Sequence, residues 1–355
     1  MLSGLASLAR PLETAEPALA IAIYADHLGG HFGANETGEE GVACLDDVSR
    51  ALVLWCDLWE RTGLAVARGW VDGLLGFCRH VQQADGRFLN FVLGWNGALN
   101  VAGPTSRADG SSFWHARGAR AMAKVWHTFR DERARADYER ARAWFDDRAT
   151  ASDVRCIQVI AALDAGDHPA DISRWCDEIL AQRRGDVFVE SPDADAPHLW
   201  AHIQEGVLAM ASLALRRPDL LDAARRSADA YLVPLVERRF DLPTAQAYGV
   251  ASAVFSLERL AAATGAARYA GAAKDARAWF DGRNPAGVAV YDRLTGRVAD
   301  GIDDDRHNPH SGAESNILGA QALIDDVAAW LLRHPEECFP SARSLRSSDG
   351  SSAAS

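Results

Sequence analysis

The sequence predicts an all-α protein whose helices form an (α/α)6 barrel, in which six inner helices are covered by six outer ones. About twelve stretches of the 355-residue chain are rich in Ala, Leu and Arg and repeat apolar residues with helical spacing. Most connections between them are short. Two long irregular segments, near residues 84–108 and 283–313, favour a closed ring with loops at one mouth. An open solenoid would need a repeating signature every ~34–47 residues, which the chain lacks.

The individual helices follow from this spacing and from start and stop signals. Pro169 and Pro218 stand near first turns, and Gly265 follows a helical run, where a left-handed residue is favoured. We expect inner helices to be apolar on nearly all sides and outer helices to be amphipathic. In chain order the predicted helices span residues 14–28, 44–61, 64–83, 109–129, 133–147, 151–165, 169–184, 197–215, 218–238, 243–263, 266–281 and 314–333.

The chain is expected to form a single domain over residues 1–340, because no Ser/Gly run, Pro run or charge block in the middle suggests a linker. Residues 341–355 are rich in Ser and contain few apolar side chains. Such a segment cannot bury enough apolar surface to order itself, so we expect a disordered tail.

The balance of charge argues against nucleic acid as a partner. The chain has 37 Lys and Arg against 49 Asp and Glu, a formal net charge of −12. A phosphate-binding surface needs clustered basic residues. The acidic excess indicates either ordinary solubility charge or an acidic cleft for a neutral or cationic ligand.

Cysteine usage and hydropathy predict a cytoplasmic protein that does not enter a membrane. None of the six cysteines forms a C-x-x-C pair, and most stand among apolar helical residues, as reduced core thiols do. The first 17 residues lack the continuous apolar core of a signal peptide. No apolar run approaches the ~20 residues of a membrane span.

Four acids are candidates for catalysis because they stand at predicted helix starts or beside the late irregular segment. Asp46 and Asp47 open the second predicted helix, Asp109 opens the fourth, and Glu314 opens the last. A capping role would also explain an acid at a helix start. In a closed ring, however, these helix starts could converge on one cleft, where paired carboxylates could act as acid and base.

A second group of residues is expected to bind a sugar, through polar hydrogen-bonding groups or aromatic faces. Arg50 lies one turn beyond the paired acids and could orient one of them. The others lie in the irregular segments or near helix starts. The full set is Arg50, Arg87, Asn90, Trp95, Trp114, His115, Trp200, Glu205, Tyr291, Asp300, His307 and His310.

No metal or other cofactor is expected. The acidic run at residues 303–305 lies near His307 and His310, and His198 and His202 are four residues apart. Neither spacing matches a calcium loop or a zinc-binding H-E-x-x-H helix. Two histidines hydrogen-bonded at a helix start would equally explain the second pair.

Several motifs resemble a helical family of bacterial carbohydrate proteins, found alone or joined to, or encoded beside, glycosyltransferases. They are Asp-Asp-x-x-Arg-Ala-Leu at residues 46–52, Asp-Gly-Arg-Phe-x-Asn-Phe at 85–91, Tyr-Asp-x-x-Thr-Gly at 291–296, Asp-Gly at 300–301 and Asn-x-x-x-Gly-Ala-Glu-Ser at 308–315. The similarity spans roughly residues 40–330. It implies a likeness to (α/α)6-barrel glycosidases, a carbohydrate substrate and, as a further partner, a glycosyltransferase.

One departure from that family bears on activity. Its members have a Ser-Glu-Asp cluster where this chain reads Ser106-Arg-Ala-Asp109, so one acid is missing. The leading expectation is a glycoside hydrolase-like enzyme that uses carboxylates as general acid and base. The alternatives are a non-catalytic glycan-binding partner of a glycosyltransferase and a polysaccharide lyase or epimerase of the same fold.

Overall fold

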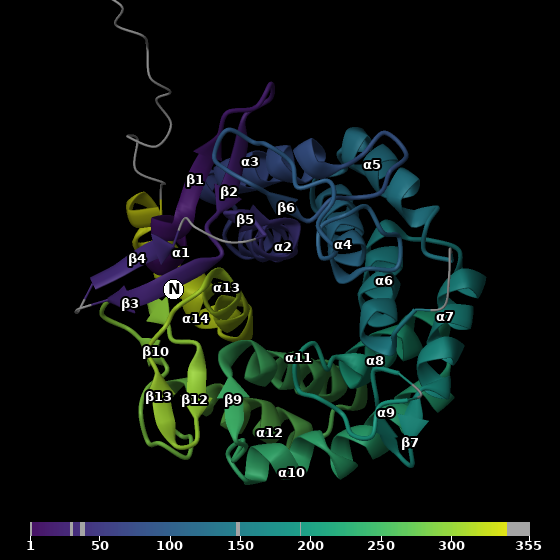
Figure 1. Ribbon diagram of the computed structural model, residues 1–355. Coiled ribbons are helices and arrows are strands. Elements are labelled where there is room, and N and C mark those ends of the chain that lie inside the picture. The colour runs from purple at the N-terminus through teal and green to yellow at the C-terminus, as the bar shows by residue number, and fades with distance from the viewer. Residues whose placement is uncertain (1, 29–30, 36–39, 147–149, 192, 339–355) are drawn as a thin grey trace, which may run out of the picture.

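A computed structural model describes residues 2–28, 31–35, 40–146, 150–191 and 193–338. It confirms the predicted (α/α)6 barrel: Figure 1 shows a ring of inner helices with outer helices around it. The inner helices are α2 (Leu45–Thr62), α4 (Phe113–Phe129), α6 (Ser152–Ala165), α8 (Gln204–Leu215), α11 (Ala247–Thr264) and α13 (Ala313–Ala322). Each inner helix contacts the next in this order, and α13 contacts α2, which closes the ring.

The outer helices each pack on the inner helix that precedes them in the chain. They are α3 (Ala65–Val81), α5 (Glu132–Arg142), α7 (Pro169–Ala181), α9 (Pro218–Ala230), α12 (Ala267–Ala278) and α14 (Ile324–Arg333). Each hairpin buries apolar side chains between its helices; in the first, the stacked rings of Trp55 and Trp70 lie 4.8 Å apart. Short helices α1 (Leu2–Leu8), α10 (Leu232–Glu237), η1 (Trp279–Asp281) and η2 (Pro335–Cys338) complete the helical part.

Short antiparallel strands decorate the ring. The pairs are β1 (Ala9–Leu12) with β2 (Ala18–Ile21), β3 (Tyr24–Leu28) with β4 (His31–Asn35), β5 (Ala43–Cys44) with β6 (Phe91–Val92), β7 (Arg183–Arg184) with β8 (Val187–Phe188), and β10 (Tyr291–Asp292) with β11 (Arg297–Val298). A three-stranded sheet joins β13 (Arg306–Asn308), β12 (Gly301–Asp303) and β9 (Thr244–Gln246). Because β9 leads into α11 and β13 precedes α13, this sheet sets the starts of two inner helices.

The predicted helix at residues 14–28 is wrong, since this segment forms strands β2 and β3. Its Ala-rich sequence favours a helix, but β2 lies tightly against α3, where Gly73 and Gly76 leave room for it. A Cβ at Gly76 would stand 2.0 Å from the carbonyl oxygen of Pro17. Tertiary packing therefore overrides local propensity here.

The predicted helix at residues 314–333 is also wrong as a single element. The chain breaks at Leu323 into α13, which belongs to the inner ring, and α14, which belongs to the outer one. Neither Gly nor Pro marks this break. Residues 341–355, predicted to form a disordered tail, lie outside the described residues, as does the predicted domain end at residue 340.

The described cysteines agree with the expected core thiols. Cys44, Cys56, Cys78, Cys156 and Cys176 are free and buried. Among the described residues, no helix combines the length and apolar character needed to cross a membrane.

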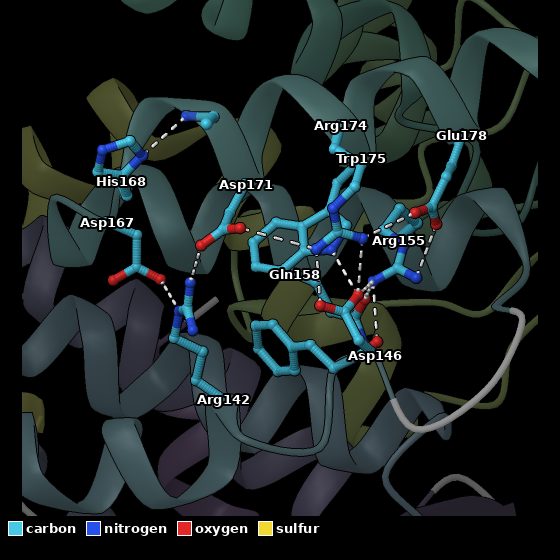
Figure 2. Close-up of polar contacts among 12 residues, drawn as sticks. Arg142, Asp146, Arg155, Gln158, Asp167, His168, Asp171, Arg174, Trp175 and Glu178 are labelled. Carbon is cyan, nitrogen blue, oxygen red and sulfur yellow. Dashed lines mark hydrogen bonds and ion pairs between the residues drawn. The ribbon is translucent and has the colours of Figure 1, made fainter.

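A polar cluster on the outside of the ring ties α5, α6 and α7 together (Figure 2). Arg155 of α6 is only 2% exposed, and its Nη2 lies 2.7 Å from Oε2 of Glu178 on α7. Its Nη1 donates to the Phe145 carbonyl and to Gln158. Arg174 of α7 completes the cluster through Asp146, at 2.7 Å, but is 47% exposed.

Replacing Arg155 by Met should lower the free energy of unfolding by about 2–4 kcal/mol, because buried hydrogen-bond acceptors would lose their donor. Arg174→Met is the matched control and should cost about 1 kcal/mol or less, because its ion pairs are exposed to water. Urea denaturation of both variants measures the difference. Equal losses would contradict a special role for the buried arginine.

Candidate active site

Three charged residues from opposite ends of the chain meet where α13 closes on α2. Nη1 of Arg50 lies 2.7 Å from Oε1 of Glu314 and 3.3 Å from Oδ1 of Asp47. Because both contacts share one nitrogen, the two carboxylate oxygens can be no farther apart than the sum of these distances, 6.0 Å. The Glu314 side chain is 26% exposed, whereas that of Asp47 is 5% exposed.

A second acid–base pair stands beside the first, between α2 and α4. Oδ1 of Asp46, whose side chain is 21% exposed, lies 2.8 Å from Nη1 of Arg117. Trp200 connects the two pairs, since its indole N–H donates to Oε1 of Glu314 at 2.9 Å. The guanidinium of Arg117 lies 5.3 Å from the centre of the same indole ring. Four segments far apart in the sequence therefore form one polar network, which we call the mouth cluster: Asp46, Asp47, Arg50, Arg117, Trp200 and Glu314.

Two predicted sugar-binding residues, Asn90 and Asp300, hydrogen-bond to the helix starts that carry the cluster. Asn90 is buried, and its Oδ1 accepts from the backbone N–H of Asp46 at 3.2 Å. Oδ1 of Asp300 accepts from the backbone N–H of Gly312 and from the hydroxyl of Ser315, at 3.1 and 2.6 Å. Both therefore position the backbone next to Asp46 and Glu314.

Burial raises the pKa of Asp47 from its ordinary 3.8 to about 6. The cation of Arg50 opposes this rise, while Glu314 and Asp46 add to it. The acid contacts raise the pKa of Arg50, against the effect of its burial, so this guanidinium stays charged. Asp47 is thus a carboxyl that can carry a proton near neutral pH.

The segment that carries Trp200 is strained. Ala201 adopts a left-handed φ of +55°, which is unfavourable for a residue with a Cβ. Helix α8 starts only at Gln204, not at residue 197 as the sequence suggested. His198 and His202 consequently do not share a helical face: His202 is buried and contacts Glu205 at 2.9 Å.

His198 lies at the rim beside Trp200, with ring centres 6.1 Å apart. Its Nε2 is 3.8 Å from Asp153 and 3.7 Å from Glu190. The side chain of His198 is 41% exposed, whereas that of Asp153 is 4% exposed. This places an accessible imidazole between two carboxylates, next to the mouth cluster.

A cavity of about 370 Å³ lies on the barrel axis beneath the mouth cluster. Arg50, Arg117 and Ala201 border it at the upper end, and Glu60 and Arg259 border it farther along their helices. Asp46, Glu314 and Trp200 are not among its lining residues. Of the mouth cluster, Arg50 and Arg117 line the cavity.

Other predicted residues near α4 have contacts on the outer side of the ring. Asp109 accepts from the backbone N–H of Ser111 at 2.9 Å and lies close enough to His115 to affect its pKa. His115 is fully buried, bonds to the carbonyl of Ala141 at 2.9 Å, and has a pKa lowered to about 4 by burial. The indole of Trp114 donates to the Phe88 carbonyl at 3.1 Å. None of these contacts is with a residue of the mouth cluster.

The remaining predicted sugar-binding residues have contacts outside the mouth cluster. Arg87 pairs with Asp85 at 2.7 Å and covers the ring of Trp144. Trp95 and Tyr291 pack against the hydrophobic core. Glu205 is buried and accepts from Ser227 of α9. His307 lies on β13, opposite Ile302, and His310 faces Asp26 at 3.5 Å.

Sequence reasoning missed Arg117, and the inner helices are not apolar on nearly all sides as expected. Charged side chains of α2 and α4 line the cavity, among them Asp57, Arg117 and Lys124. On α4 the charged positions 117, 120 and 124 recur with the spacing of one helical face. That spacing was the available signal for a polar face inside the ring.

Comparisons with known proteins support the fold. No protein-family model and no curated protein matches the sequence. A family 76 glycoside hydrolase (mannosidase) from Bacteroides thetaiotaomicron has a TM-score of 0.63 and 11% identity, over 94% of this chain and 98% of that one. Cellobiose 2-epimerase from Bacillus thermoamylovorans has a TM-score of 0.64 and 10% identity, over 92% of this chain and 96% of that one. A D-mannose isomerase has a TM-score of 0.62 and 9% identity, over 86% of this chain and 92% of that one. At such identities the likeness establishes the barrel architecture.

The pH dependence of stability tests the environment of Asp47. Its pKa is raised in the folded state, so the protonated carboxyl contributes to the free energy of unfolding. That contribution is fully present below about pH 4 and is lost as pH rises through about 6. Relative to Asp47→Asn, the wild type should lose as much as about 3 kcal/mol of unfolding free energy over this range. Urea denaturation at pH 4, 5, 6 and 7 measures it.

The control for this titration is Asp85→Asn. A hydrogen bond from Arg87 lowers the pKa of Asp85, which is exposed. Its contribution to the free energy of unfolding should therefore be small and should be lost as pH falls. This pH dependence is opposite in sign to that of Asp47. A flat difference between wild type and Asp47→Asn would show that Asp47 is not a buried, proton-binding carboxyl.

Proposed function

We propose that the protein is a carbohydrate-acting enzyme that cleaves a glycosidic bond at the mouth cluster. The observation that carries this proposal is the pair formed by Glu314 and Asp47 around Arg50. Hydrolysis of a glycosidic bond needs one ionised and one protonated carboxyl close together. Glu314 is partly exposed, its Oε1 lies 2.7 Å from Nη1 of Arg50, and the same oxygen accepts from the indole N–H of Trp200.

In this proposal Glu314 attacks the anomeric carbon while Asp47, at the floor of the mouth, protonates the leaving oxygen. Water, whose proton passes to Asp47, then attacks the same carbon and releases the sugar from Glu314. The raised pKa of Asp47 suits a proton donor. The limit of 6.0 Å between their nearest named oxygens is shorter than the ~6.5–9.5 Å of inverting glycosidases and favours retention. Asp46, 21% exposed beside Arg117, accepts hydrogen bonds from sugar hydroxyls, and Trp200 presents an aromatic face.

Glu314→Gln should lower kcat at least ~100-fold, since it removes the reacting charge while keeping the side-chain shape. Asp47→Asn should have a comparable effect, whereas Asp46→Asn should mainly raise KM. New reducing ends released from a panel of neutral and acidic polysaccharides measure the rates, and proton NMR of the first product anomer measures the stereochemistry.

Glu237→Gln, an exposed acid on α10, is the matched control and should keep full activity. Undiminished activity in Glu314→Gln would refute the catalytic assignment. Loss of kcat in Asp46→Asn but not in Asp47→Asn would contradict the role given to Asp47. Glycan binding without turnover would support the non-catalytic alternative, a binding partner of a glycosyltransferase.

His198 favours a second candidate function, the epimerisation or isomerisation of a free sugar. A base that removes a proton next to a carbonyl must be accessible, and this imidazole is exposed at the rim between Asp153 and Glu190. Cellobiose 2-epimerase and D-mannose isomerase share the barrel fold. The two carboxylates would orient the imidazole ring.

Incubating reducing mono- and disaccharides with the protein in D2O distinguishes the two reactions. Epimerisation or isomerisation should introduce deuterium at C2 without a change in the number of reducing ends, and His198→Gln should reduce exchange at least ~100-fold. Mass spectrometry and proton NMR follow the exchange. Absence of deuterium in every sugar would exclude this second candidate.

A further inference from the structure

The cavity beneath the mouth is lined by more basic than acidic side chains, although the whole chain carries a net charge of −12. Its basic lining residues are Arg50, Arg61, Arg117, Arg120, Lys124 and Arg259. Its acidic lining residues are Asp57, Glu60 and Glu258. A local excess of cations inside an acidic protein concentrates positive potential there, because low-dielectric walls focus the field.

Most of these cations already have acidic partners. Arg50 and Arg117 pair with acids of the mouth cluster. Lys124 lies 2.8 Å from Asp57 and 2.9 Å from Glu60, so one cation faces two acids at the deeper end. Arg61 pairs with Asp325 at 3.4 Å, and Glu258 pairs with Arg277. The paired groups leave little free charge.

Arg120 and Arg259 are the exceptions. Among the described residues neither makes an ion pair, and the buried Nε of Arg120 has no hydrogen-bond partner. Arg259 lies over the ring of Phe255, at 5.3 Å from its centre. Burial lowers the pKa of Arg120; Asp164 and Asp57 raise it from a distance, and Arg259 and Arg117 lower it further.

The helix dipole does not account for these two residues. A cation near a helix C-terminus is favoured only within the last turn, as for Arg61 at the end of α2. Arg120 lies in the middle of α4, and Arg259 stands more than a turn before the end of α11. Arg259 is exposed, whereas the Nε of Arg120 is buried. A buried cation with no partner destabilises the protein, unless a ligand supplies the missing anion.

We propose that the cavity binds the anionic group of a saccharide, a carboxylate or a phosphate, between Arg120 and Arg259. Guanidinium groups bind both oxyanions through charge-assisted hydrogen bonds. This inference rests on the proposed function only in that the anion is carried by a sugar. It narrows the substrate class to acidic saccharides, such as uronic acids or sugar phosphates.

The dimensions of the cavity suit such a ligand. Arg120 follows Arg117 on α4 by three residues, which is roughly 4.5 Å of helix rise away from the mouth. A sugar ring held by Asp46 and Glu314 could direct an anionic substituent past Arg117 toward Arg120. The volume of about 370 Å³ is within the ~300–1,000 Å³ of small-molecule sites.

Isothermal titration calorimetry on the full chain tests the proposal with matched sugars. D-glucuronate and glucose 6-phosphate should bind at least tenfold more tightly than D-glucose, and the tighter of the two identifies the anion. Arg120→Gln and Arg259→Gln should each remove that preference. Arg225→Gln, on the exposed face of α9, should leave it unchanged. Equal binding of glucose and both acidic sugars would overturn the proposal.

A second measurement does not depend on the choice of sugar. Inorganic phosphate should raise the Tm of the wild type, compared with chloride at equal ionic strength, and should not raise that of Arg120→Gln. Without any anion, Arg120→Gln should melt at or above the temperature of the wild type, because it removes an unpaired buried charge. A phosphate shift of the same size in both proteins would overturn the site.

The two proposals fail in different ways. Turnover of neutral glycans, with no effect of anions or of Arg120→Gln, would leave the hydrolytic function standing and overturn the anion site. Anion binding that is lost in Arg120→Gln, without turnover of any glycan, would support the anion site and refute the hydrolytic function.

Discussion

The contact between Arg50 and Glu314 is the interaction on which the site depends, because it is made where the ring closes. It joins the first inner helix to the last at a distance of 2.7 Å. The same seam is held by Gln321 of α13, which donates to the backbone carbonyl of Arg50 at 3.1 Å. Closure of the barrel and assembly of the acid pair are therefore one event.

The architecture could be predicted from the sequence because the middle hairpins are regular. From α2 to α12 the helical spacing and the short connections predict most elements. The two ends of the barrel were harder: residues 14–28 read as a helix but pair as strands against α3, and Leu323 breaks the last helix without a Gly or Pro. In both places long-range packing determines the backbone conformation, and the local sequence contains no signal for it.

The site was only partly predictable, for a related reason. Asp46, Asp47, Arg50, Trp200 and Glu314 do come together, as the convergence of helix starts on one mouth implies. Asn90 and His115 stand in similar sequence surroundings, but one binds a helix start and the other packs against α5. Which side of a helix faces the ring centre depends on rotation about its axis, and a mixed polar and apolar sequence leaves that rotation undetermined.

Ring closure by residues at both ends of the sequence also has a consequence for how the protein is made. Translation produces α2 long before α13, so the helix that covers the seam face of α2 is made after the other five inner helices. Contacts over such sequence separations form late and slowly. A ribosome-bound chain that has not yet extruded α13 lacks Glu314, so the mouth cluster is complete only after α13 has emerged.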